Sequence, residues 1–379
     1  MKEKLQYMGF HKKTDFVLAA VLYMIINLLF VDKYTARITE WHYLCDIVYL
    51  LISTCLIFLS TWSSKREWSF RSILCIGGLV CISTLIWLQY QIDPMQLHVD
   101  RWSAIHNFLY NLFHGVYPYA AQTHSGGYGS PFPVWQILHI PFYLLGNVGL
   151  SFFAVLILFL CTMVKCVSPR AATISLLLIV FSPAITYEVA VRSDLFTNFL
   201  LVCSLCLWLQ FKHVEIESST YLIATIVGLC ASTRLATVIP LAYLYGYAFL
   251  QLNWQKQIGF IVTTCAVFIL TFLPFMLWDA GQLFFFEYNP FVLQTRQGSP
   301  LILISFALIA ICWTIYKKND TQHFELYAGC LLTLLVVITF LHNMISSGNF
   351  ALFSSQYDIT YFNMALPFYI CSLTKSLTP

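Results

Sequence analysis

The chain has 379 residues, of which 59% are hydrophobic and only 10% carry a charge. Soluble domains contain roughly 25% charged residues, so this composition excludes a water-soluble globular protein and indicates an integral membrane protein. The formal net charge is +3, and we expect membrane lipids, not nucleic acid, as the surroundings of the chain.

Apolar runs of about 15–20 residues recur at short intervals along the sequence, a pattern typical of membrane-spanning helices. We predict an all-α polytopic membrane protein with about 12 transmembrane helices, outer-face loops and interfacial half-helices, forming a single transmembrane domain over residues 1–379. The predicted spans lie near 16–31, 43–61, 72–90, 149–166, 171–187, 194–211, 221–234, 236–251, 258–278, 300–316, 325–341 and 358–374.

The N-terminal residues resemble a signal peptide, because a basic segment from Lys2 to Lys13 precedes an apolar run. No small-x-small cleavage site closes that run, so we interpret it as a retained first helix. With the N-terminus inside, most Lys and Arg residues fall on the cytoplasmic side, as the positive-inside rule requires. Both termini are predicted to be cytoplasmic, and a bacterial inner membrane is favoured over the endoplasmic reticulum.

The longest interruption of the apolar pattern is residues 91–148, which we predict to be the first large outer loop. Apolar residues at three-to-four spacing over 99–114 predict an amphipathic helix lying in the membrane interface. The segment 133–145 is too short to span and is bounded by proline, so it is predicted to be a half-helix that dips into the membrane. Such backbone is tolerated only where it lines a cavity or is buried.

Carboxylates at the start of this loop are the candidate catalytic groups. Asp100 begins the predicted interfacial helix, where the helix dipole favours an ionised carboxylate able to accept a proton; its alternative role is a helix cap. Asp93 precedes Pro94 and is equally explained as a cap or turn former. His98 and Asp100 are two residues apart and would suit a metal, but one His and two Asp without further spacing are a weak metal signal. No cofactor is required.

Three arginines on the predicted outer side are candidate anion-binding groups. Arg234 lies at the tip of a tight hairpin between apolar runs, where a lipid phosphate is a suitable partner for a guanidinium; a snorkelling side chain is the alternative. Arg296, in the 279–299 loop, is a second possible phosphate contact. Arg192 and Asp194 lie between two spans, where they pair with each other or cap the next helix.

The order of these features resembles the GT-C class of membrane glycosyltransferases, above all the polyprenol-phosphate-mannose-dependent mannosyltransferases and their bacterial relatives. The similar elements are Asp100, the helical run, the 115–119 segment Gly-Val-Tyr-Pro-Tyr and the 131–133 segment Pro-Phe-Pro. The stretches 182–194 and 232–234 also resemble that class. Many members carry Asp-x-Asp where this chain has His98-Val-Asp100, which leaves open both metal use and the choice between Asp93 and Asp100.

The resemblance implies an enzyme that takes a sugar from a polyprenyl phosphate on the outer face and transfers it to a lipid or glycan acceptor. Asp100 or Asp93 would be the general base that deprotonates an acceptor hydroxyl, which attacks the anomeric carbon with inversion. The residues implied to hold the substrate and its lipid phosphate are Arg234, Arg296, Arg192, His98, Tyr119 and Glu188.

Two other classes of protein share part of this pattern. A lipid-linked-glycan flippase or other transporter needs many spans and a charged cavity, but transporters favour internal repeats and broken helices at mid-membrane depth. This chain instead gathers its charges at one face, which favours an enzyme. An O-antigen-type polymerase usually centres on arginines in large outer loops, and the predicted outer loops here contain few.

Overall fold

The computed structural model describes residues 2–61, 67–295, 299–316, 323–354 and 356–376. The chain is 79% helical, and no β-strand is present in the described residues. The all-helical class predicted from the sequence is therefore confirmed. One isolated β-bridge is present in the described residues, between Gln122 and Tyr128, and it closes the glycine-rich turn of the first large loop.

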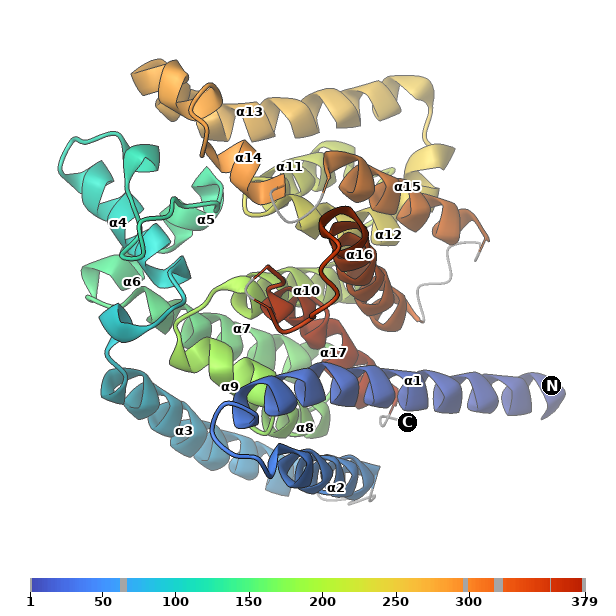
Figure 1. Ribbon diagram of the computed structural model, residues 1–379. Coiled ribbons are helices and arrows are strands. Elements are labelled where there is room, and N and C mark those ends of the chain that lie inside the picture. The colour runs from blue at the N-terminus through green and yellow to red at the C-terminus, as the bar shows by residue number, and fades with distance from the viewer. Residues whose placement is uncertain (1, 62–66, 296–298, 317–322, 355, 377–379) are drawn as a thin grey trace.

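Twelve of the described helices overlap the predicted spans and pack together in one bundle (Figure 1). They are α1 (Lys2–Thr35), α2 (His42–Thr61), α3 (Glu67–Gln91), α7 (Ser151–Cys166), α8 (Pro169–Val180), α10 (Leu195–Phe211), α11 (Thr220–Ala231), α12 (Val238–Gln251), α13 (Trp254–Phe284), α15 (Pro300–Tyr316), α16 (Phe324–Ser347) and α17 (Leu366–Ser376). The other helices of the described residues lie between them in the chain: η1 (Pro94–Gln96), α4 (Arg101–Phe113), η2 (Pro118–Ala120), α5 (Pro133–Leu138), α6 (Ile140–Leu144), η3 (Val148–Leu150), α9 (Pro183–Ala190), η4 (Leu235–Thr237), α14 (Pro290–Thr295) and η5 (Ile359–Met364).

Five of the described helices are long and apolar enough to cross a membrane, or six if the bent pair α8 and α9 is one span. Five further apolar helices, which also coincide with predicted spans, are only 10–17 residues long, shorter than the ~20 residues that a membrane crossing needs. The number of twelve spans therefore stays a prediction. The span predicted over 171–187 is divided, because α8 and α9 meet at an angle of 69°.

The centre of the bundle is filled by α10, which is apolar around its whole circumference and buried along most of its length. It packs against α7 and α17, and α17 in turn contacts α1 and α16. The outer helices α2, α3, α13 and α15 instead expose large apolar side chains, as lipid-facing helices do.

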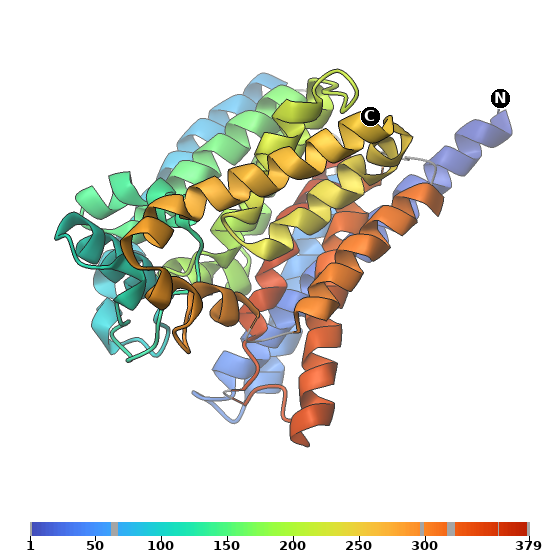
Figure 2. The same ribbon diagram turned by 90° about the horizontal axis from the view of Figure 1, so that it is seen from above.

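A second, smaller hydrophobic cluster holds the first large loop against α13. The buried face of α4 supplies Trp102, Ile105, Phe108 and Leu109, which pack with residues of η2, α5 and α13. The helix predicted over 99–114 corresponds to α4, and the half-helix predicted over 133–145 is divided into α5 and α6 at His139. We call the end of the bundle that carries α4, α5, α14 and η5 the loop end; Figure 2 shows it opposite the N-terminus of α1.

Candidate functional site

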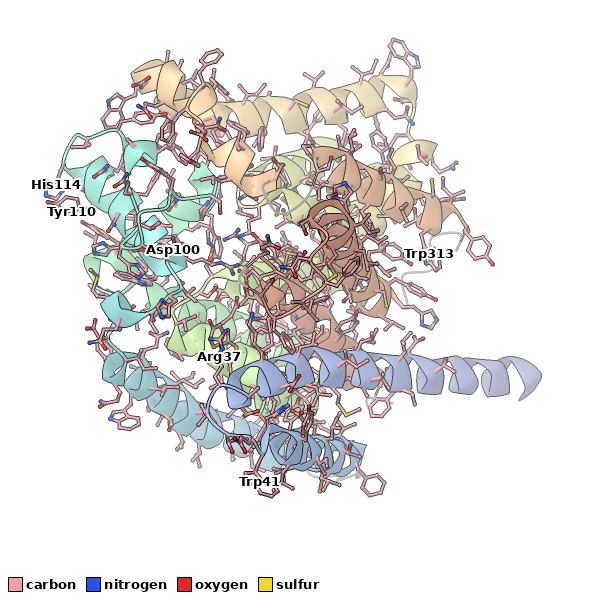
Figure 3. The ribbon with its side chains drawn as sticks, in the orientation of Figure 1. Arg37, Trp41, Asp100, Tyr110, His114 and Trp313 are labelled. Atoms are coloured by element: carbon pink, nitrogen blue, oxygen red, sulfur yellow. The ribbon has the colours of Figure 1, made fainter. Side chains whose placement is uncertain are left out.

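A polar cavity of about 430 Å³ opens at the loop end. Its walls come from five separate parts of the chain: the start of α4, the 126–131 turn, the α11–η4 junction, the segment around α14 and the segment around η5. Asp100 lies at this end of the molecule, far from Trp313 at the other end (Figure 3). The lining residues are Asp100, Arg101, Ala104, Gly126, Gly127, Tyr128, Ser130, Pro131, Arg234, Tyr288, Leu293, Asp358 and Tyr361.

The Asp100 carboxylate is held by two hydroxyl groups of the glycine-rich turn. Its Oδ2 accepts hydrogen bonds from Thr123 Oγ1 at 2.8 Å and from Ser125 Oγ at 2.7 Å. Asp100 occupies the N-cap position of α4, but its side chain makes no capping hydrogen bond. The Asp100 side chain therefore does not cap α4, which was the alternative role predicted for it. A Cβ at Gly127 would lie 3.0 Å from Asp100 Oδ2, so a larger residue there would displace the carboxylate.

Arg234 forms a sealed ion pair with Asp194. Arg234 Nη2 donates to Asp194 Oδ2 at 2.6 Å, and the residues are only 6% and 3% exposed. Trp135 Nε1 donates to the same oxygen at 2.7 Å. Burial by itself raises the pKa of Asp194, but the Arg234 guanidinium outweighs it and holds that pKa below its ordinary value. Arg234 Nε has no hydrogen-bond partner among the described residues.

A second ion pair, between Arg101 and Asp358, also lines the polar cavity. Arg101 Nη2 donates to Asp358 Oδ2 at 2.5 Å, and its Nη1 donates to Ser193 Oγ at 3.1 Å, with Glu188 Oε1 at 3.8 Å. Burial raises the pKa of Asp358, but Arg101 outweighs burial and lowers it. The guanidinium of Arg101 also lies 5.3 Å from the centre of the Tyr361 ring. Arg101 and Asp358 are 257 residues apart and were not among the predicted site residues.

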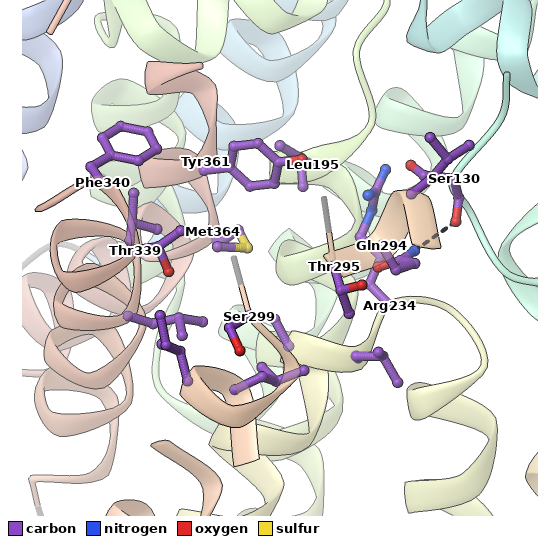
Figure 4. Close-up of a pocket in the computed structure, with 17 residues that line it drawn as sticks. Ser130, Leu195, Arg234, Gln294, Thr295, Ser299, Thr339, Phe340, Tyr361 and Met364 are labelled. Atoms are coloured by element: carbon purple, nitrogen blue, oxygen red, sulfur yellow. Dashed lines mark hydrogen bonds between the residues drawn. The ribbon is translucent and has the colours of Figure 1, made fainter. Parts of the chain in front are cut away.

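A smaller and mostly apolar cavity of about 90 Å³ adjoins the polar one (Figure 4). Large apolar side chains of α15, α16 and η5 line one side of it, and further apolar residues come from α10, η4 and α14. Gln294 Nε2 donates to the Ser130 carbonyl at 2.8 Å across its rim. Both cavities are lined by Ser130, Arg234, Leu293 and Tyr361. The guanidinium of Arg234 therefore lies where a polar and an apolar space meet.

Three other candidates from the first loop lie outside both cavities. Asp93 is exposed and caps η1 by accepting a hydrogen bond from the Met95 backbone N–H at 3.0 Å. Asp93 therefore has the cap or turn role that was the alternative to catalysis. His98 is exposed. Tyr119 is buried in the smaller hydrophobic cluster, with its ring edge-on to Phe108.

Arg192 and Glu188 have structural partners. Arg192, in a left-handed backbone conformation (φ 55°), donates to the Gln89 carbonyl at 2.8 Å and does not pair with Asp194. Glu188 accepts hydrogen bonds from the Phe196 backbone N–H at 2.7 Å and from Ser193 at 3.1 Å. Arg296 lies outside the described residues. Among the described side chains, Asp93, His98 and Asp100 do not bring three ligating atoms together for a metal.

No protein-family model matches this chain, and neither the curated proteins nor the solved structures include a match. The two adjoining cavities and the sequence resemblance are therefore the observations that bear on function.

Proposed function

We propose that this chain is a membrane glycosyltransferase that moves a sugar from a polyprenyl-phosphate donor to an acceptor hydroxyl. The observation that carries the proposal is the junction of the two cavities at Arg234, with Asp100 on the polar side. A ligand that fits such a junction has a polar group and an apolar group joined by an anion. A lipid-linked sugar phosphate has this order of parts.

Each part of the donor has a chemically suitable position. A phosphate at the junction would meet the guanidinium of Arg234, which lines both cavities and whose Nη2 is held by Asp194. The first segment of the prenyl chain would occupy the apolar cavity between α15, α16 and η5, and the rest of the chain would lie in the lipid. The sugar would then lie in the polar cavity, whose volume of about 430 Å³ falls within the usual range for small-molecule sites.

Asp100 has the features required of a general base. Its Oδ2 is occupied by Thr123 and Ser125, which leaves Oδ1 without a hydrogen bond of this kind and orients the carboxylate in the cavity wall. In the proposed reaction the carboxylate takes the proton of an acceptor hydroxyl as its oxygen bonds to the anomeric carbon. The bond from that carbon to the phosphate oxygen breaks, and the lipid phosphate leaves with the electron pair.

Both proposed roles are known to accelerate reactions of this kind. General base catalysis contributes roughly 10²–10⁴-fold, and a fixed cation at a leaving phosphate stabilises the charge that develops there. Because a phosphate is a weakly basic leaving group, no acid is needed on that side. Arg234 is prevented from moving by its buried pair with Asp194, so the cation is already in place before the donor binds.

The test is a mass-spectrometric comparison of lipid-linked sugars and surface glycans in host cells. The cells carry the wild type, a deletion, Asp100→Asn, or Asp93→Asn as the matched control for an exposed loop carboxylate. We expect the deletion and Asp100→Asn to truncate the same glycan by one sugar, while Asp93→Asn behaves as wild type.

Other outcomes identify other functions. Complete glycans that stay on their lipid carrier in the deletion would replace the proposal with a flippase or an O-antigen-type polymerase. Full activity of Asp100→Asn with loss in the deletion would remove Asp100 as the base. An unchanged pool in all cells would refute the glycosyltransferase proposal.

A further inference from the structure

Asp32, His42 and Asp46 come together where α1 ends and α2 begins, and none of the three lines either cavity. His42 Nδ1 lies 2.7 Å from Asp32 Oδ1. His42 and Asp46 are four residues apart on α2 and therefore share one face of the helix, the face that meets Asp32 of α1. One ligating atom from each of the three side chains lies within 4.8 Å of the others.

The protein groups of this cluster do not supply every carboxylate oxygen with a hydrogen-bond donor. The cluster holds two carboxylates and one imidazole, and the charged groups that act on Asp46 are Asp32 and His42. Asp46 Oδ1 is closed off from solvent and has no hydrogen-bond partner among the described residues. A buried carboxylate oxygen without a donor is costly, and an acid in the first turns of an apolar helix is a functional hypothesis by default.

We propose that Asp32, His42 and Asp46 form a binding site for one divalent transition-metal cation of the Zn²⁺ type, which fastens the start of α2 to the end of α1. One imidazole nitrogen and two carboxylate oxygens are accepted zinc ligands, and a water molecule completes a tetrahedral set. The mixture of imidazole and carboxylate favours such a cation over Mg²⁺ or Ca²⁺, which take oxygen ligands.

The site is accessible to an ion and needs little movement to accept one. The side chains of His42 and Asp32 are 19% and 32% exposed, so a hydrated cation can reach them. Binding requires neutral His42, with its Nδ1 lone pair turned from the Asp32 oxygen to the cation. The competing arrangement is a protonated His42 paired with Asp32 alone, which binds no metal and leaves Asp46 Oδ1 unpartnered.

The test uses the purified full-length chain in detergent micelles, freed of metal by chelation. Thirteen cysteines are present and none is in a disulfide among the described residues, so accessible thiols are first blocked with N-ethylmaleimide. Zn²⁺ is then titrated by calorimetry, and Co²⁺ by its visible absorption, which distinguishes nitrogen and oxygen ligands from thiolate. We expect one ion per chain and a higher unfolding temperature with Zn²⁺ present.

Two variants make the assignment specific. His42→Gln and Asp46→Asn keep the size of each side chain and should weaken binding at least about 100-fold, because even second-shell losses cost 10–100-fold. The matched controls are His98→Gln and Asp93→Asn, which change an exposed imidazole and an exposed carboxylate of the first large loop. Both control variants should bind the ion as the wild type does. Wild-type binding no tighter than that of His42→Gln, or no bound ion at all, would overturn the proposal.

Discussion

The buried pair of Arg234 and Asp194 gives the sharpest energetic prediction. Asp194→Asn removes the negative charge but keeps the size of the side chain and an oxygen for Trp135 Nε1. Because Arg234 is only 6% exposed, its charge stays buried without a counterion in the variant. Breaking a buried pair in this way costs about 3–5 kcal/mol, which corresponds to a loss of roughly 10²–10³-fold or more in the folded-to-unfolded ratio.

The assay is reversible unfolding in mixed detergent micelles with increasing SDS, followed by tryptophan fluorescence. Asp93→Asn is the matched control, because Asp93 is exposed and asparagine caps a helix as well as aspartate does. The control should therefore unfold with the wild type. A loss for Asp194→Asn below about 1 kcal/mol, or equal to that of the control, would refute the account of Arg234 as a buried cation held by Asp194.

The pH dependence of the same measurement checks the charge argument. The pKa of Asp194 is lowered in the folded chain, so its stabilising contribution is fully present above the ordinary carboxyl pKa of about 4. That contribution is lost as the pH falls through the lowered value. The gap between wild type and Asp194→Asn should thus be constant from about pH 5 to 7 and shrink in stronger acid. A gap that widened on acidification would contradict this sign.

Two glycine substitutions should have different effects, one on activity and the other on stability. Gly127→Ala places a methyl carbon 3.0 Å from Asp100 Oδ2 and 3.3 Å from Thr123 Oγ1; we expect in vitro sugar transfer to fall at least about tenfold with unfolding unchanged. Gly228→Ala places Cβ 2.8 Å from the Thr264 carbonyl, which forces α11 and α13 apart and should cost about 1–3 kcal/mol in the SDS assay. Gly77→Ala, whose added Cβ meets nothing within 4 Å, is the control.

Several features of the candidate site were predictable because they depend on local patterns. The amphipathic spacing over 99–114 predicts α4 and places Asp100 at its first turn, as the structure shows. The tight hairpin between two apolar runs predicts that Arg234 lies at a helix tip. Because spans alternate in direction, both residues are expected at the same end of the bundle, and they line one cavity.

The partners of these residues were not predictable, because they come from distant parts of the chain. Asp194 was expected to pair with Arg192 or to cap a helix, yet it pairs with Arg234, forty residues further on. Arg192 instead turns to the Gln89 carbonyl. Tyr119, placed near the substrate by the resemblance, packs into the hydrophobic cluster under α4.

The sequence alone was enough to predict that this protein lies in a membrane and at which end of the bundle its charges gather. Both follow from hydropathy and the spacing of apolar runs, which are local properties that a lipid environment imposes on the sequence. Only the tertiary structure decided which charges are neutralised in pairs and which remain at a cavity. That choice depends on how α4, α10, the α11–η4 junction and η5 pack together, and on the cost of leaving a charge unpaired away from water.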